Sequence, residues 1–217
     1  MRKTGQWMAM LVLALALRPA RAADEENLLV FVGERISVEQ FKPELPPNVL
    51  MMDGAFKAKF RVRQVVYGRY EGEAIEFDAY DHYGIPPFAG YAHSLLFVSR
   101  DGDRFVQQKY QYFPVFRTRG GEWNGCGPVG PRDTEQRRGV VATLPATFAE
   151  DAFIALPHDR QRGGDRHWFA DAHFRVEGDR AHCLTGSSLH DLFELKKRTV
   201  LKARGLFGGD DAAPASR

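Results

Sequence analysis

Residues 56–68 of this chain read FKAKFRVRQVVYG, and their alternation decides the fold. Ala58, Phe60 and Val62 fall on one side of an extended segment, and four basic residues fall on the other: Lys57, Lys59, Arg61 and Arg63. This pattern predicts a half-buried β-strand. After Gln64 apolar side chains occupy both sides, so either both faces are covered there or a bulge shifts the phase. Gly68 ends the run.

The segments around this strand also read as strands. Residues 28–32 (LLVFV) are a short apolar run, and residues 75–79 (IEFDA) alternate apolar with acidic. Residues 94–99 (SLLFVS) have the continuous apolar centre of a strand that is covered on both faces. Asp101-Gly102 predicts a hairpin turn into a long aromatic strand over 105–118. The proline-rich residues 42–47 predict a loop.

The aromatic residues are concentrated in one part of the chain. Between Phe56 and Trp123 lie eight of the 16 Phe and all seven Tyr. Aromatic side chains suit a pleated, half-buried surface. The sequence therefore predicts a mainly β fold, a small coiled OB-like barrel with its core at about 56–123.

An extension over 124–207 follows and ends in a helix. Residues 127–138 read as a loop, 139–144 as a strand, and 168–176 with 181–184 as a hairpin around Gly178. Ser188 and Asp191 form a helix N-cap, and Gly205 is placed to end the helix. A basic cluster on this helix predicts either a solvated face or a contact for an acidic partner: Lys196, Lys197, Arg198, Lys202 and Arg204. Residues 208–217 are predicted to be a disordered tail.

Residues 56–123 resemble the netrin/TIMP-like version of the OB-fold. The resemblance lies in residues 60–68 (FRVRQVVYG), 75–77 (IEF) and 95–98 (LLFV). It implies a barrel fold and a binding role. In the metalloproteinase-inhibitor members an amino-terminal cysteine chelates the zinc of the target, and this chain has no cysteine before Cys126. The inhibitory activity is therefore not expected here.

Residues 1–22 have the three parts of a cleavable signal peptide. Arg2 and Lys3 precede an apolar run over 7–17, which is too short to span a bilayer, and Ala20-Arg21-Ala22 forms a cleavage site. The predicted working chain is one β-rich domain over 23–207, exported to the periplasm or outside the cell, with no stable membrane anchor.

The leader also carries the positive charge of the chain. It holds four of the 30 basic residues and none of the 28 acidic ones, so the remainder has 26 basic against 28 acidic residues. This balance gives no electrostatic argument for binding nucleic acid. In an oxidising compartment the two cysteines, Cys126 and Cys183, are expected to form one disulfide.

No catalytic or cofactor-binding motif is present in the sequence. His167, Asp171 and His173 share one parity, as zinc ligands on a strand would, but an extended segment would span roughly 20 Å, so a polar sheet face is the expected outcome. No metal and no cofactor are predicted.

Two groups of residues remain as candidate binding sites. Asp78, Asp81 and His82 combine carboxylates with an imidazole, which suits acid–base chemistry or the end of a strand. The second group is aromatic and reads either as a binding groove or as core: Tyr110, Tyr112, Phe113, Phe116 and Trp123. Asp81, His82, Tyr110, Tyr112 and Trp123 are the predicted binding residues.

The absence of a catalytic signature favours a non-catalytic binding or interaction module with an unknown protein or small ligand. Two alternatives remain. One is an exported hydrolase that uses the Asp/His groups, and the other is an assembly factor of the cell envelope that docks through the carboxyl-terminal helix.

Overall fold

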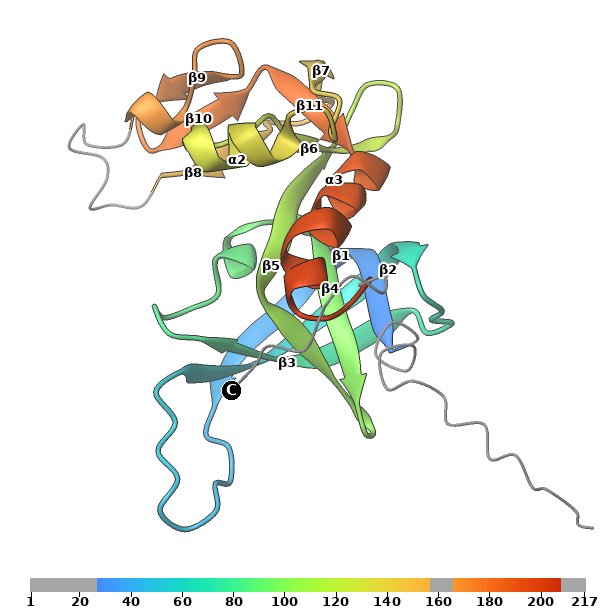
Figure 1. Cartoon of the computed structure of the whole chain (residues 1–217), viewed down its shortest axis with the longest axis vertical. Coiled ribbons are helices and arrows are strands. Elements are labelled where there is room, and N and C mark those ends of the chain that lie inside the picture. The colour runs from blue at the N-terminus through green and yellow to red at the C-terminus, as the bar shows by residue number, and fades with distance from the viewer. Residues whose placement is uncertain (1–26, 157–165, 208–217) are drawn as a thin grey trace, which may run out of the picture.

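A computed structural model describes residues 27–156 and 166–207 of the chain (Figure 1). The predicted signal peptide over 1–22 and the predicted tail over 208–217 lie outside the described residues. Within the described ranges no helix is long and apolar enough to cross a membrane.

Five strands close into a barrel in the lower half of Figure 1. They are β1 (Leu28–Phe41), β2 (Gly54–Tyr67), β3 (Ala74–Asp81), β4 (His93–Asp101) and β5 (Arg104–Arg117). The ring runs β1-β2-β3-β5-β4 and returns to β1, and only the β3–β5 pairing is parallel. A short 3₁₀ helix, η1 (Pro87–Gly90), connects β3 to β4. The predicted mainly β, small barrel fold is confirmed.

The change of phase in β2 is produced by bulges. Gly33 pairs with Val62 while Val32 pairs with Gln64, so Arg63 is an extra residue, and Val66 is a second one. Each extra residue moves the following side chains to the opposite face. The barrel also begins earlier than predicted, because β1 pairs with both β2 and β4 and belongs to the ring.

Residues 28–32 of β1 and 94–98 of β4 are covered on both faces, as the continuous apolar centre of residues 94–99 predicts for β4. Phe31 and Leu96 point into the barrel, where they pack with Phe60. Val30 and Phe97 point outward into a second hydrophobic cluster beneath the carboxyl-terminal helix. Two cores sharing the same strands explain why residues 28–32 of β1 and 95–98 of β4 are all apolar.

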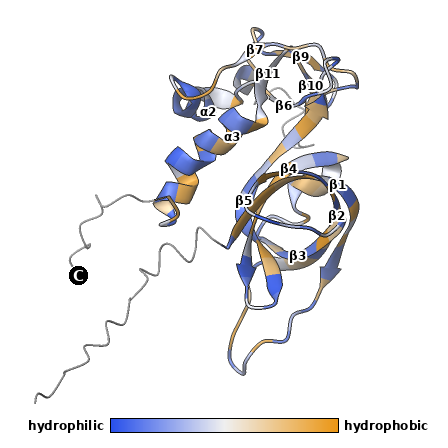
Figure 2. Ribbon diagram, turned by 90° about the vertical axis from the view of Figure 1, so that its right-hand side faces the viewer, coloured by the Kyte–Doolittle hydropathy of each residue, from blue (hydrophilic) through white to orange (hydrophobic). Residues whose placement is uncertain are grey.

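The helix α3 (Leu189–Lys196) continues as the π-helical turn η3 (Lys197–Leu201) along the outside of the barrel. Ser188 caps it as predicted, because its hydroxyl accepts a hydrogen bond from the Asp191 N–H at 3.1 Å. Leu192 and Leu201 are fully buried against the barrel. In Figure 2 the ribbon of α3 accordingly alternates between hydrophilic and hydrophobic residues. The helix is thus part of the core, and its apolar face is not open to a partner.

Above the barrel lies a second unit, which we call the stapled module (residues 123–156 and 166–188; Figure 1). β6 (Trp123–Cys126), β11 (Thr185–Ser188) and β7 (Leu144–Pro145) extend the sheet beyond β5. A three-stranded sheet has the order β8 (Phe153–Ala155), β10 (Arg180–Cys183) and β9 (Phe174–Glu177). A disulfide joins Cys126 to Cys183, with their Cα atoms 5.5 Å apart, which confirms the predicted pairing.

Three predictions in this module are wrong. Residues 130–137, read as loop, form the helix α2 (Gly130–Arg137), which Pro131 opens and to which Asp133 contributes by accepting the Val129 N–H at 2.9 Å. The predicted strand over 139–144 is reduced to Leu144–Pro145. The predicted strand over 168–176 begins only at Phe174, because Arg166–Trp168 is the 3₁₀ helix η2 and residues 171–173 form a turn.

Candidate functional site

β5 carries a large bulge, at which side chains point out of the barrel. Leu96 pairs with Tyr112 and Val98 pairs with Gln107, so β5 has three residues more than β4 in this stretch. Tyr110 has a φ of 64°, in the left-handed region that a tyrosine seldom adopts. A backbone conformation as unfavourable as that of Tyr110 is kept only where neighbouring residues hold the chain in place.

Contacts from three directions hold this bulge. The Arg204 guanidinium donates to Gln108 Oε1 and to the Lys109 carbonyl, both at 2.8 Å. The Gln111 side-chain amide donates to the same carbonyl at 3.1 Å, and the Gln108 amide donates to Ser99 Oγ at 2.7 Å. The bulge is therefore fixed before any ligand arrives.

The bulge meets the β1–β2 and β3–β4 loops in a cluster that we call the tyrosine ledge, made of Asp53, Asp81, His82, Tyr83, Lys109 and Tyr110. Lys109 Nζ lies 2.5 Å from Asp53 Oδ2, and His82 Nδ1 lies 3.6 Å from Asp53 Oδ1. The hydrogen bond to Asp53 raises the pKa of the Lys109 ammonium. Asp53 therefore ties the β1–β2 loop to the ledge.

Aromatic rings form the exposed part of the ledge. The Tyr83 ring lies 6.2 Å from the Tyr110 ring and 5.4 Å from the His82 ring, centroid to centroid. The Tyr83 N–H donates to Asp81 Oδ1 at 2.8 Å, and the His82 N–H donates to the Tyr110 hydroxyl at 3.4 Å. Three of the predicted binding residues, Asp81, His82 and Tyr110, thus lie together.

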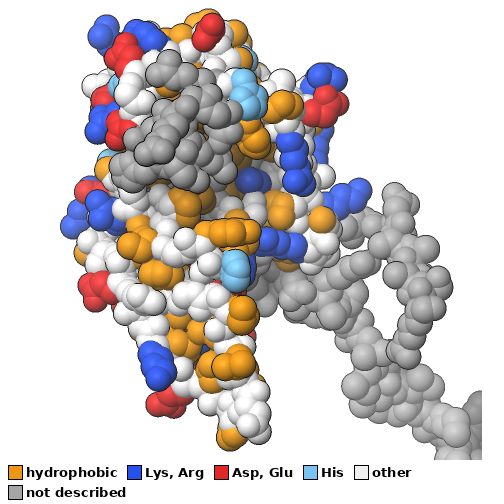
Figure 3. Space-filling model, turned by 90° about the vertical axis from the view of Figure 1, so that its left-hand side faces the viewer, with side chains coloured by type: hydrophobic (Ala, Val, Ile, Leu, Met, Phe, Trp, Pro, Cys, Tyr) orange, Lys and Arg blue, Asp and Glu red, His pale blue; other side chains and the backbone are white. Residues whose placement is uncertain are grey.

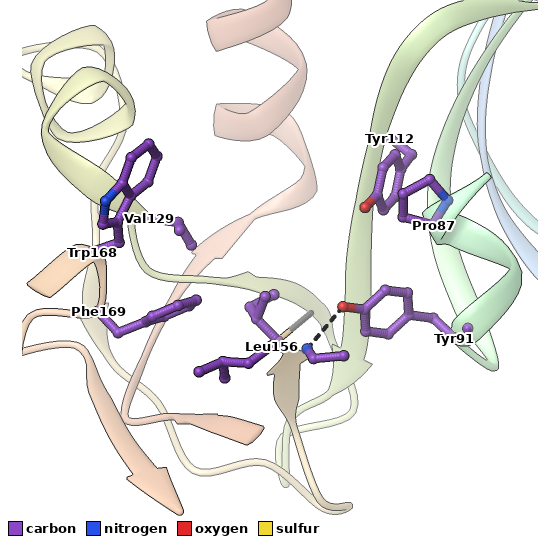
Figure 4. Close-up of a pocket in the computed structure, with 10 residues that line it drawn as sticks. Pro87, Tyr91, Tyr112, Val129, Leu156, Trp168 and Phe169 are labelled. Atoms are coloured by element: carbon purple, nitrogen blue, oxygen red, sulfur yellow. Dashed lines mark hydrogen bonds between the residues drawn. The ribbon is translucent and has the colours of Figure 1, made fainter. Parts of the chain in front are cut away.

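A pocket of about 390 Å³ lies between the barrel and the stapled module (Figure 4). Pro87, Tyr91 and Tyr112 form its wall on the barrel side, and Trp168 and Phe169 lie opposite. The remaining lining residues are small or aliphatic: Gly90, Val129, Ile154, Ala155 and Leu156. The walls are mostly apolar, as is usual for a site that takes a small ligand or a single side chain.

Two tyrosine hydroxyls supply the polar groups of this pocket. The Tyr91 oxygen accepts a hydrogen bond from the Ala155 N–H at 3.0 Å. The Tyr112 hydroxyl is directed toward the opposite wall in Figure 4 and has no hydrogen-bond partner among the described residues. Burial raises the pKa of both phenols, and for Tyr112 the phenol of Tyr91 and the charge of Asp81 raise it further. Both groups therefore remain protonated donors at neutral pH.

The other predicted aromatic residues belong to the core. Trp123 is buried, with its ring 4.7 Å from the His93 ring and the Arg117 guanidinium 4.1 Å above it. Phe113 packs beneath α3, and Phe116 packs inside the stapled module. Trp123, predicted as a binding residue, lies in the hydrophobic cluster beneath α3, because β6 turns its side chain inward.

The remaining polar candidates have structural partners. Asp78 is buried and paired with Lys57 at 2.5 Å and Arg104 at 3.4 Å. His173 Nδ1 lies 2.9 Å from Thr185 Oγ1, and burial together with the charge of Arg137 lowers its pKa. Among the residues that the structure describes, no group of three His, Cys, Asp or Glu side chains is placed to hold a metal ion.

The ledge and the pocket have different chemical capacities. The ledge offers a paired carboxylate and ammonium beside exposed rings, and the pocket offers apolar walls with phenol donors. Both cysteines are paired in the disulfide, so neither supplies a thiolate nucleophile. The arrangement is therefore suited to holding a ligand.

Sequence reasoning missed Asp53 and Lys109 in the ledge and Tyr91, Trp168 and Phe169 in the pocket. Three of these had a local signal, because Asp53 follows the apolar Met51-Met52, and Trp168 and Phe169 form an aromatic pair outside the barrel. Comparison with protein-family models, with curated proteins and with solved structures found no match for this chain.

Proposed function

We propose that this protein is an exported, non-catalytic binding module and that the apolar part of its ligand occupies the pocket between the barrel and the stapled module. The observation that carries the proposal is the pocket itself, with apolar walls and a Tyr112 hydroxyl that lacks a partner among the described residues. The Tyr112 hydroxyl can donate a hydrogen bond to an acceptor group of a ligand in the pocket, which would orient the ligand and add to its affinity.

Export is supported by two features of different kinds. Residues 1–22 have the composition of a signal peptide, and Cys126 and Cys183 form a disulfide, which persists in oxidising compartments. The resemblance of residues 56–123 to netrin/TIMP-like modules agrees with a binding role, and it remains a proposal.

The test uses N-phenyl-1-naphthylamine, an uncharged apolar dye whose emission rises in apolar surroundings. The protein, produced from the full chain in an oxidising compartment, is titrated with the dye. Saturable binding is expected. Val129→Trp should abolish it, because the indole fills the pocket, while Leu144→Trp adds an indole at an exposed position elsewhere and should bind as the wild type does.

Two results would overturn the proposal. One is the absence of saturable binding to the wild-type protein. The other is equal binding by Val129→Trp and wild type when both unfold cooperatively at similar temperatures, because the dye would then bind outside the pocket.

A further inference from the structure

A second pocket, of about 230 Å³, lies in the stapled module beside the helix α2, and we call it the arginine pocket. It shares no described lining residue with the pocket between the barrel and the module. The polar residues that line it, as far as the structure describes them, are basic or neutral, and none is acidic: Thr134, Arg137, Arg138, Thr143 and His173.

Charge of one sign distinguishes this pocket from the surface of the module. In the upper part of Figure 3, where the stapled module lies, basic and acidic side chains are interspersed. They pair with one another there, as the Arg180 guanidinium does with Asp151 at 2.8 Å. A pocket whose charged lining groups are basic favours an anionic ligand.

Arg137 is fixed in the wall of the pocket, with only 6% of its side chain exposed. Its Nε donates to Asp133 Oδ1 at 3.0 Å, and its Nη1 donates to the Cys126 carbonyl at 3.0 Å and to Ser187 Oγ at 3.3 Å. Nη2 forms no hydrogen bond to a described residue. The guanidinium is therefore held in one orientation, and the N–H donors of Nη2 remain for a ligand in the pocket.

A hydroxyl and an imidazole add two more donors. Ser187 Oγ accepts from Arg137 and lies 3.2 Å from Thr143 Oγ1, so Ser187 can donate to Thr143 and leave the Thr143 hydrogen for a ligand. His173 Nδ1 lies 2.9 Å from Thr185 Oγ1, and His173 Nε2 has no partner in the described part of the chain. Three separate segments of the module thus bring donors to one pocket.

The positive charge around Arg137 exceeds the negative charge. Asp133 is the carboxylate that pairs with Arg137. The Arg137 guanidinium lies 5.9 Å and the Lys196 ammonium 4.6 Å from the centre of the Phe113 ring, so two cations adjoin the same ring. Lys196 has no ion pair with a described carboxylate. An anion in the arginine pocket would offset this excess charge.

We propose that the arginine pocket binds a tetrahedral oxyanion, a phosphate or sulfate group. Such an anion presents an oxygen to each of Arg137, Thr143 and His173, whereas the two oxygens of a carboxylate lie in one plane. Hydrogen bonds from a guanidinium to an oxyanion are short and strong. The free ion and the phosphate or sulfate group of a larger molecule share this chemistry. The site is separate from the pocket proposed above for an apolar ligand and does not depend on it.

His173 couples binding to pH. Burial and the positive charge of Arg137 lower the pKa of its imidazole, so it is neutral at pH 7.5 in the free protein. A bound dianion favours the imidazolium, which donates through Nδ1 to Thr185 and through Nε2 to the anion. Arg138, which α2 also contributes to the pocket, is basic, and Asp171 in the turn of His173 lines a different pocket. Binding therefore takes up a proton, and affinity rises as the pH falls through the titration of His173.

The test is isothermal titration calorimetry of the disulfide-bonded protein with sodium sulfate and with sodium phosphate, at an ionic strength held constant with sodium chloride. Saturable binding is expected, with a dissociation constant of about 1 mM or below. Sulfate keeps its charge over this pH range, and we expect it to bind at least about threefold more tightly at pH 5.5 than at pH 7.5.

His173→Asn tests the imidazole, because the asparagine side chain keeps a polar group near Thr185 and removes Nε2. It should weaken sulfate binding at least about fivefold at pH 5.5 and abolish the pH dependence. Thr143→Val should weaken binding about 3–10-fold at both pH values. His190→Asn is the matched control, since His190 is exposed on α3 and does not line the pocket, and it should bind as the wild type does.

Arg137→Lys should abolish binding, because it removes Nη2. Since Arg137 also holds the Cys126 carbonyl, this variant is informative only if it unfolds cooperatively, and the Thr143 and His173 variants decide the question if it does not. Phenyl phosphate distinguishes the two sources of the anion. Binding equal to that of inorganic phosphate would mean that the pocket admits the phosphate group of a larger molecule, and exclusion would mean that the free ion is the ligand.

Three results would overturn the inference. The first is the absence of saturable binding of both anions at pH 5.5. The second is wild-type affinity in both Thr143→Val and His173→Asn when these unfold at the wild-type temperature, because the anion would then lie elsewhere. The third is acetate binding as tightly as sulfate, which would contradict the tetrahedral geometry of the ligand.

Discussion

At the residue scale, the Tyr112 hydroxyl is the group that we expect to select among ligands of the proposed binding pocket. This hydroxyl has no partner among the described residues, so a ligand acceptor should gain a hydrogen bond there. We expect 2-acetylnaphthalene to bind about 3–10 times more tightly than 2-ethylnaphthalene, and Tyr112→Phe to remove this preference. Competition against N-phenyl-1-naphthylamine measures both affinities.

Tyr70→Phe is the control for this prediction, because the Tyr70 hydroxyl donates to the Ala74 carbonyl and does not line the pocket. A ketone preference that survives in Tyr112→Phe would show that the donor is another group.

Lys196 is a second residue for which a prediction can be made, in this case for the free energy of unfolding. Its ammonium lies 4.6 Å from the centre of the Phe113 ring and forms no ion pair with the described carboxylates. Burial, reinforced by the charges of Arg137 and Arg204, lowers its pKa to about 8, while Asp133 acts in the opposite direction. The charged form of Lys196 is therefore less favourable in the folded state than in the unfolded state.

The pH window follows from this shift. Below pH 8 the lysine is charged in both states and the full penalty applies. Between pH 8 and 10.5 the folded state has lost its proton while the unfolded state keeps it, so stability rises with pH. We expect Lys196→Met to increase the free energy of unfolding at pH 7 by on the order of 2–3 kcal/mol, with the gain shrinking toward pH 10.

Urea unfolding at pH 7 and pH 10 measures this difference. Lys202→Met removes a lysine that is exposed on the same helical segment and should change stability little at either pH. A Lys196→Met protein that is less stable than wild type at pH 7 would contradict the argument.

At the scale of the elements, the disulfide restrains the stapled module and not the barrel. Cys126 and Cys183 are 57 residues apart, and both lie in the hydrophobic cluster of that module. The chain-entropy model gives about 4 kcal/mol for a loop of this length. We expect Cys126→Ala/Cys183→Ala to unfold at a lower temperature and to exchange amide hydrogens faster in residues 126–156 and 166–183.

The barrel strands over 28–117 should keep most of their protection in this variant, because neither cysteine lies in the ring. Hydrogen exchange followed by mass spectrometry separates the two regions. If amide exchange became faster by the same factor in the barrel and in the stapled module, the two would unfold as one unit.

The local sequence pattern predicted those elements in which the type and spacing of the side chains reflect burial or helix capping. Residues 57–63 alternate because one face of β2 is inside the barrel, and Ser188 begins α3 because its hydroxyl accepts the Asp191 N–H. The helix α2 escaped prediction because GPRDTEQR has no apolar residue whose spacing could show a helical period. Its position depends on Pro131 and Asp133, which also suit a loop.

At the scale of the whole molecule, the site depends on closure of the barrel and on the placement of the module above it. The pocket is lined by residues from five separate segments, which no local pattern connects: Pro87, Gly90 and Tyr91, then Tyr112, Val129, residues 154–156 and residues 168–169. The ledge was found in part because Asp81 and His82 are adjacent in sequence, whereas Asp53 and Lys109 join them only when the ring closes. Apart from the disulfide, which the two cysteines predicted, contacts between distant segments are therefore what sequence reasoning could not supply.

The same arrangement predicts how binding responds to salt. The walls of the pocket are mostly apolar, so its attraction for an uncharged ligand should come from burial of apolar surface. We expect the affinity for N-phenyl-1-naphthylamine to change less than about twofold between 50 and 500 mM sodium chloride, because the dye carries no charge for salt to screen. Sodium sulfate should strengthen binding, because it is excluded from protein surfaces and favours burial. Fluorescence titrations in both salts measure this, and a loss of tenfold or more in sodium chloride would mean that charge, and not apolar contact, holds the ligand.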